Sequence, residues 1–331
     1  MKEELLVTAR SNPLVDPSLD VWTWEVAFDL FMGGLTAGII IIAAMMTLMR
    51  KDEQAPFATR QLALLAPIVL SLGMTTLFMD LEYKLHVFRF YTSFQPTSPM
   101  SWGSWILLVI YPASMLQILS TLRIGYAPIA DYVDRVAIGT WLLDLCERNR
   151  RAIAYLIIPF AIGLGIYTGI LLSAFSARPF WNSGALPPLF LVSGLTTAAA
   201  LTALCARDQG EKAAFTRAYL LLIVANLALL ALYLISLATG SGPQLEALHR
   251  VTGGAYTMAF WGLFVGLCLL FPLLLGLLRI SAASKSAAVL AAVLVVLSGY
   301  AMRQVVLDVG QESSWTIYDT QYSAELLERL R

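Results

Sequence analysis

The sequence has one segment, residues 80–105, in which side chains able to exchange protons stand between two long apolar runs. Its ionisable residues are Asp80, Glu82, Lys84, His86 and Arg89. Imidazole titrates near neutral pH, and the pKa of a carboxyl group responds to burial and to a nearby cation. We therefore predict proton transfer here, with Glu82 and His86 as acting groups. The alternative is a solvated loop whose ion pairs contribute little energy.

Two further carboxylates, Glu25 and Asp29, lie at the start of the first apolar run. Their i,i+4 spacing places them on one face of a helix, and a rise of 1.5 Å per residue puts Asp29 roughly 10 Å beyond Trp22. A carboxylate inside the bilayer costs about 2.5–3.5 kcal/mol and usually faces a protein interior or a watery cavity. We predict that Asp29 transfers protons. Snorkelling towards the headgroups, or a structural pair with an arginine, is the alternative.

Other polar side chains are predicted to meet these carboxylates from separate parts of the sequence. Ser101 and Trp102 open the third apolar run, Tyr167 lies near the end of the fourth, and Arg178 follows it. Hydroxyl groups and cations of this kind bind polar oxygens of a ligand. Tryptophan at such a position is more often an anchor at the membrane interface.

The composition defines the elements that position these residues. Of 331 residues, 58% are hydrophobic and 13% are charged, against about 25% charged in soluble domains, and the mean hydropathy is +0.73. About 20 apolar residues cross a bilayer as a helix. We predict an all-α polytopic bundle that forms a single integral membrane domain over residues 1–331. Its eight spans are expected at 22–49, 61–79, 102–122, 152–175, 186–206, 214–238, 253–278 and 287–307. A transmembrane β-barrel is disfavoured because runs such as GLCLLFPLLLGLL do not alternate.

The distribution of basic residues predicts the orientation. Of the 22 Lys and Arg residues, 13 fall in the loops after spans one, three, five and seven, including Arg148, Arg150 and Arg151. Because cytoplasmic loops are enriched in Lys and Arg, both termini are expected on the outer, periplasmic side. The candidate residues then share the outer face. An interfacial helix is expected at 131–147 on the inner side, and an outer tail at 308–331.

The sequence contains WTWEVAFDLFMGGLTAG in the first span, the acid-rich turn followed by SPMSWGSWIL, and YTGILLS followed by P-x-W-N and PLFLVSGLTTAAA. These motifs resemble those of the NrfD family, the polysulfide reductase-type membrane anchors of molybdoenzyme complexes. The resemblance covers the first five spans, whereas the last three match in hydropathy alone.

The resemblance implies a quinone-reactive anchor subunit in the inner membrane of a bacterium engaged in anaerobic respiration. Such a subunit exchanges electrons between menaquinone or ubiquinone and a four-cluster ferredoxin-like iron–sulfur subunit. That partner contacts a molybdopterin catalytic subunit, and protons are exchanged at the periplasmic face. The protein would belong to a quinone-dependent oxidoreductase without holding the catalytic metal.

Carried over by position, the resemblance places Asp29 at the quinone headgroup, where polysulfide reductase has a histidine. Glu82 corresponds to the acidic residue after span two and Tyr167 to the tyrosine of span four. The remaining expected quinone-site residues are Glu25, Lys84, Arg89, Ser101, Trp102 and Arg178. A carboxylate accepts hydrogen bonds and donates one only when it is protonated.

Other cofactor types are not expected in this protein. His86 and His249 fall in predicted outer loops, so a transmembrane haem lacks ligands. Cys146, Cys205 and Cys268 are too widely spaced for an iron–sulfur cluster or zinc. Nucleotide-binding motifs and a basic, aromatic patch for nucleic acid are also missing. Electrons are therefore expected to come from another subunit.

Two other classes of function remain as alternatives. A solute or ion transporter with an outward-facing polar site would also use intramembrane acids, although it would place polar residues and broken helices at the midplane. An intramembrane hydrolase would need a nucleophile such as Ser193, but that residue lacks a G-x-S-G context and His249 is its only hint of a base.

Overall fold

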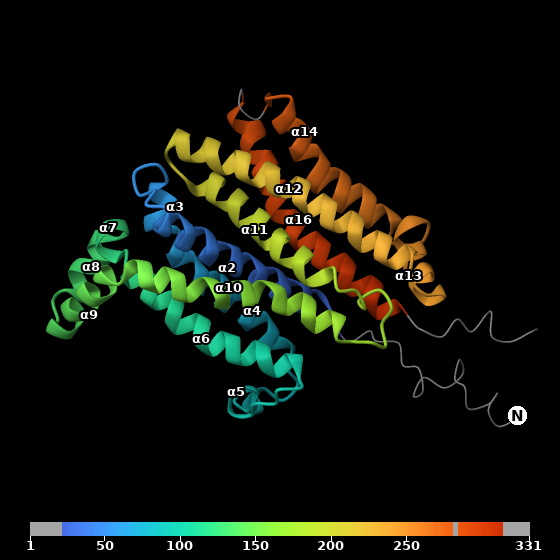
Figure 1. Cartoon of the computed structure of the whole chain (residues 1–331), viewed down its shortest axis with the longest axis horizontal. Helices are drawn as coiled ribbons and strands as arrows, with labels where there is room; N and C mark the ends of the chain where they lie inside the picture. The colour runs from blue at the N-terminus through green and yellow to red at the C-terminus, as the bar shows by residue number, and fades with distance from the viewer. Residues whose placement is uncertain (1–21, 281–283, 314–331) are drawn as a thin grey trace, which may run out of the picture.

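The computed structural model describes residues 22–280 and 284–313, and within them every regular element is helical (Figure 1). Eight helical segments are long and apolar enough to cross a membrane. They are α2 (Trp24–Leu48), η1 with α4 (Leu62–Asp80), α6 (Pro99–Leu119), α10 (Arg150–Ser173), α11 (Leu186–Cys205), α12 (Gln209–Ala238), η3 with α14 (Met258–Leu277) and α16 (Lys285–Glu312). The predicted all-α polytopic architecture is confirmed.

The spans form two groups that follow the order of the sequence (Figure 1). Helices α2, α4, α6 and α10 pack together, and α11, α12, η3–α14 and α16 form the second group. Helices α2 and α11 pack against each other and so join the two groups. In the most apolar 18-residue stretch of each helix, 83% of the residues of α2 are buried, against 28% of those of α12. A β-carbon at Gly38 would overlap the Gly194 carbonyl oxygen, so small residues let these two backbones touch.

Helix ends differ from the predicted ones where local chemistry extends a helix. α6 begins at Pro99 because proline fits the first turn, which needs no amide donor there. α12 begins at Gln209, since the Asp208 carboxylate accepts a hydrogen bond from the Glu211 amide at 2.8 Å. α16 continues to Glu312, so it includes the first residues of the predicted outer tail. Residues 314–331 of that tail lie outside the described residues.

A short irregular connection links α4 to α6 and carries the predicted proton-active segment. It contains η2 (Lys84–His86) and α5 (Arg89–Thr92), which packs on α6. The Gln95 amide donates to Ser101 Oγ at 3.0 Å, and the Trp102 indole donates to the Pro96 carbonyl at 2.7 Å. These bonds fold the connection back onto the first turn of α6.

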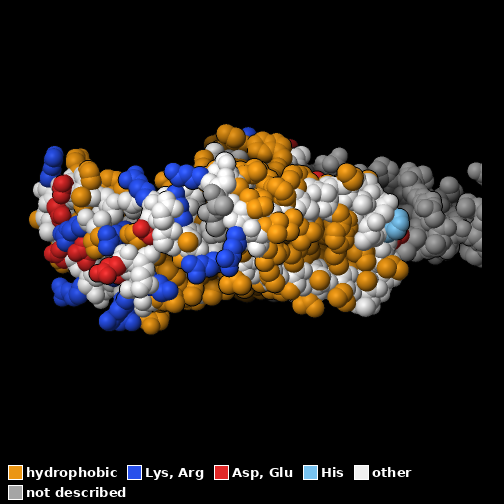
Figure 2. Space-filling view, turned by 90° about the horizontal axis from the view of Figure 1, so that it is seen from above, with side chains coloured by type: hydrophobic (Ala, Val, Ile, Leu, Met, Phe, Trp, Pro, Cys, Tyr) orange, Lys and Arg blue, Asp and Glu red, His pale blue; other side chains and the backbone are white. Residues whose placement is uncertain are grey.

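The opposite end of the molecule carries the short helices α3 (Pro56–Arg60), α7 (Leu122–Gly125), α8 (Ala127–Val133) and α9 (Ala137–Arg148). The segment expected to be one interfacial helix at 131–147 therefore contains the end of α8 and most of α9. Arg123 pairs with Asp134, Asp144 and Glu147 at 2.8, 2.6 and 3.1 Å. The Arg123 hydrogen bond holds the pKa of Asp134 below its ordinary value. On the face shown in Figure 2, Lys and Arg gather at this end.

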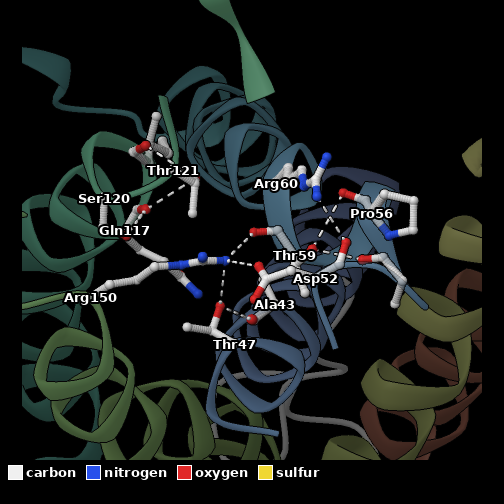
Figure 3. Close-up of polar contacts among 12 residues, drawn as sticks. Ala43, Thr47, Asp52, Pro56, Thr59, Arg60, Gln117, Ser120, Thr121 and Arg150 are labelled. Atoms are coloured by element: carbon white, nitrogen blue, oxygen red, sulfur yellow. Dashed lines mark hydrogen bonds and ion pairs between the residues drawn. The ribbon is translucent and has the colours of Figure 1, made fainter. Parts of the chain in front are cut away.

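A separate ion pair at this end, between Arg150 and Asp52, fixes the start of α10 against α2 and α3 (Figure 3). The Arg150 guanidinium donates to Asp52 Oδ1 at 2.8 Å and to the Thr59 carbonyl at 3.2 Å. Arg60 donates to the backbone carbonyl of Asp52 at 3.1 Å. The two arginines thus fix the loop after α2 to α3 and to the start of α10, which is a structural role.

Candidate functional site

A cavity of about 270 Å³ lies within the first group of helices, at the end that carries α5. Its walls are mostly apolar, including Leu30, Met74, Phe78 and Leu171. The polar side chains that reach it are Asp29, Asp80, Tyr91, Ser104, Tyr167 and Thr168. An apolar hollow with a few convergent polar groups is the usual form of a small-molecule site.

Asp29 enters the cavity from α2, about 8 Å along the helix from Trp24 at 1.5 Å per residue. Its side chain is half-buried, and among the described residues its carboxylate makes no hydrogen bond or ion pair. Gly73 of α4 leaves room for it, because a β-carbon there would lie 3.0 Å from Asp29 Oδ1. The carboxylate is therefore available to a ligand.

Tyr167 enters from α10 and depends on the glycine of the SWGSW motif. A β-carbon at Gly103 would overlap the phenol ring and hydroxyl of Tyr167. The lack of a side chain at position 103 thus lets the ring lie against α6 while it lines the cavity. The glycine of the motif therefore makes room for the Tyr167 ring.

Tyr91 reaches the same cavity from the connection between α4 and α6. Burial raises the pKa of its hydroxyl above the ordinary value, and Tyr111 and Asp29 raise the pKa further. Tyr91 consequently stays protonated at neutral pH and can donate a hydrogen bond.

A second, more open hollow of about 560 Å³ adjoins the cavity. It is lined by Glu82, His86, Arg89 and Ser101, and it shares Leu81, Phe90 and Met100 with the cavity. Glu82, His86 and Arg89 are exposed. The predicted residues thus fall into two neighbouring spaces, with Asp29 and Tyr167 in the inner one and these four in the outer one.

Four other predicted site residues line neither hollow. Lys84 is exposed, and Glu25 is half-buried and accepts a hydrogen bond from the Thr23 hydroxyl. Trp102 is 39% exposed, with its indole bonded to the Pro96 carbonyl as described above.

Arg178 is the fourth of these residues, and it has a structural role outside the cavity. Its guanidinium is buried and donates to the carbonyls of Gln311 and Ser313 at 2.9 and 2.8 Å. It therefore fastens the loop after α10 to the end of α16. In that loop Trp181 stacks on Trp22, with ring centroids 5.6 Å apart, and Trp22 lines the cavity.

Four polar cavity residues were outside the predicted site, and one of them, Ser104, lies in the SWGSW motif. Asp80 lies in the same acid-rich turn as Glu82, and Tyr91 lies two residues beyond Arg89, so their neighbourhood carried the signal. Thr168 follows Tyr167 directly. Its hydroxyl is buried and has no hydrogen-bond partner among the described residues. Only a three-dimensional arrangement identifies that unpaired group.

The fold defines a multi-pass helical membrane protein, and the cavity at the α5 end of its first helix group is a candidate small-molecule site. The family described as "Polysulphide reductase, NrfD" matches residues 7–313, and the protein belongs to this family.

Three relatives have names that fit this assignment. The C subunit of polysulfide reductase from Wolinella succinogenes is 31% identical over 180 residues, which span 53% of this protein and only 55% of that relative. Protein NrfD of Escherichia coli K12 is 30% identical over 272 residues, 77% of this protein and 84% of that relative. The NrfD homologue of Haemophilus influenzae is 26% identical, with 79% and 84% covered.

Proposed function

We propose that this protein is the quinone-reactive membrane subunit of a respiratory oxidoreductase and that the cavity holds the quinone headgroup. The observation that carries the proposal is the apolar cavity near the membrane boundary that Asp29 and Tyr167 line from two packed helices. A lipid-soluble ring with two polar oxygens suits walls that are apolar except for a few hydrogen-bonding groups. Menaquinone and ubiquinone both have this character.

A bound quinone supplies two-electron, two-proton redox chemistry, and the side chains of this protein serve its proton half. Asp29 takes a proton from a quinol oxygen, or returns one when it is itself protonated. Tyr167 and Tyr91 donate hydrogen bonds to the ring oxygens. The apolar walls exclude water, which strengthens these interactions.

Protons leave the cavity through its outer rim. Asp80 lies at the end of α4 and is exposed, so it connects the cavity to the surface. Glu82 and His86 line the adjoining open hollow, where both side chains are exposed. We assign Asp29 to proton transfer at the headgroup, and Glu82 and His86 to proton exchange with the bulk phase.

The family and the charge distribution support a proposal for the partners and the location. A relative named as a subunit of polysulfide reductase supports membership of a multi-subunit complex. We propose that an iron–sulfur subunit docks over the cavity end and passes electrons to or from a molybdopterin subunit. The Lys- and Arg-rich end, which carries α3 and α7–α9, then faces the cytoplasm. Both termini and the cavity face the periplasm of a bacterial inner membrane.

Asp29→Asn in the assembled complex tests the proposal. We expect quinol-dependent turnover to fall by about 10²–10⁴-fold, the usual contribution of a positioned acid–base group. The reaction of the soluble subunits with an artificial electron carrier should be unchanged, which confirms assembly. Glu25→Gln is the matched control, because Glu25 is one helical turn away and lines neither hollow. Unchanged quinol turnover in Asp29→Asn would refute the assignment.

A further inference from the structure

One hydroxyl in the cavity wall is exceptional among the buried threonines of this protein. Eight threonines are buried in the described residues. Seven of them donate to a backbone carbonyl: Thr36, Thr47, Thr59, Thr121, Thr196, Thr197 and Thr202. The eighth is Thr168, whose Oγ1 is buried with no hydrogen-bond partner in the part of the protein that the structure describes.

The bonds of the other threonines make the exception informative. A threonine in a helix normally satisfies its hydroxyl by donating to the carbonyl three or four residues earlier. Thr47, Thr196 and Thr202 do so at 2.9, 2.7 and 2.7 Å. Since a buried hydroxyl without a partner is unfavourable, a side chain that forgoes this bond is expected to have another partner.

The position of Thr168 identifies where that partner sits. Its side chain is only 4% exposed, yet it lines the cavity that contains Asp29 and Tyr167. Tyr167 and Thr168 are consecutive on α10, whereas Asp29 comes from α2. A molecule in the cavity therefore meets polar groups from several helices, and the buried Thr168 hydroxyl among them has no partner in the described residues.

We propose that the Thr168 hydroxyl binds a ring oxygen of the quinone headgroup, an inference that rests on the proposed function. A hydroxyl donates to the carbonyl of a quinone and accepts from the hydroxyl of a quinol. Thr168 can thus hold both redox forms, whereas ionised Asp29 only accepts. Its role is to bind and orient the ring while Asp29 exchanges the proton.

The test compares Thr168→Val with Thr168→Ser in the assembled complex, using a soluble quinol analogue. Valine keeps the shape of threonine and removes the hydroxyl, while serine keeps the hydroxyl. We expect Thr168→Val to raise KM about tenfold, the value of one hydrogen bond to a bound ligand, with kcat changed less than about twofold. Thr168→Ser should restore KM. Thr202→Val, which loses a hydroxyl bonded within α11, is the matched control and should leave KM unchanged.

Two results would overturn this inference. Wild-type KM in Thr168→Val would show that the hydroxyl does not bind the substrate. Equal rises in KM for both variants, together with a lower melting temperature, would show a packing role instead. Asp29→Asn measured in the same preparations separates the two proposals. If Asp29→Asn is impaired and Thr168→Val is not, the site stands and only the role of Thr168 fails. If Asp29→Asn is also unimpaired, the proposed function fails.

Discussion

Two charged side chains inside the membrane-spanning helices, Arg303 and Asp29, have opposite surroundings. The Arg303 guanidinium on α16 is fully buried and donates to the carbonyls of Leu30, Gly299 and Phe190 at 2.9, 2.8 and 3.2 Å. It also donates to Ser193 Oγ at 3.3 Å and lies 5.0 Å from the centroid of the Phe190 ring. Asp29 has no such partners among the described residues and lines a cavity.

The comparison separates an ionisable residue whose polar atoms are held by hydrogen bonds from one whose polar atoms are available to a ligand. Both side chains lie at the same height along α2, because Arg303 donates a hydrogen bond to the carbonyl of Leu30, the residue next to Asp29. Arg303 lies in a closed cage that links α2, α11 and α16. The sequence left open a structural pair between Asp29 and an arginine. No such pair occurs among the described residues, and Arg303 donates its hydrogen bonds to other groups.

The largest effect on stability is expected from Arg303→Ala. This substitution removes the hydrogen bonds to Leu30, Ser193, Gly299 and Phe190 and leaves a cavity where α2, α11 and α16 meet. It should cost about 3–5 kcal/mol. Asp29→Asn should change the free energy of unfolding by less than about 0.5 kcal/mol, because it breaks no bond among the described residues. Thermal unfolding of the detergent-solubilised complex measures both. Equal destabilisation by the two variants would remove the distinction between them.

The next largest effect is expected from Gly103→Ala, which tests whether the SWGSW motif positions Tyr167. The added methyl group must displace the phenol ring, and a displacement of about 1 Å at a reacting group can reduce turnover by roughly 10²-fold. Gly163→Ala is the matched control on α10, because a β-carbon there meets only Ile106 Cδ1, at 3.8 Å. Quinol-dependent turnover of the two complexes decides the question. Normal turnover in Gly103→Ala would exclude Tyr167 from the site.

The smallest effect separates the two neighbouring hollows. Asp80 lies in the cavity with Asp29, whereas Glu82 lines the open hollow beside it. We expect Asp80→Asn to lower quinol turnover about tenfold, somewhat less than a group that acts directly on the reacting atoms, and Glu82→Gln to lower it less than about twofold. A greater loss in Glu82→Gln than in Asp80→Asn would show that Glu82, and not Asp80, limits proton transfer out of the cavity.

The fold was predictable because hydropathy and length determine transmembrane helices directly. The eight spans lie where the apolar runs predicted them, and the differences at their ends come from caps such as Pro99 and Asp208. Inside the bilayer, few structures other than a helix satisfy the hydrogen-bonding groups of the backbone. The segment predicted as one helix at 131–147 contains the end of α8 and most of α9, because the backbone leaves the helical conformation between Val133 and Ala137.

The candidate site was predictable only in part. The rule that intramembrane carboxylates line cavities pointed to Asp29, and Tyr167 came from the family motif. Which member of the acid-rich turn reaches the cavity depends on how the connection folds over α6, and it is Asp80 rather than Glu82. Thr168 has the same sequence character as the threonines that bond within their helices. Only the packing of α10 beside α2 distinguishes it.

The most direct test of the account is an experimental structure of the assembled complex with a quinone analogue bound. We predict density for the ring in the cavity between α2 and α10, with one ring oxygen within hydrogen-bonding distance of the Asp29 carboxylate. Density for the ring in the open hollow beside Glu82 and His86, or outside the first group of helices, would contradict the account.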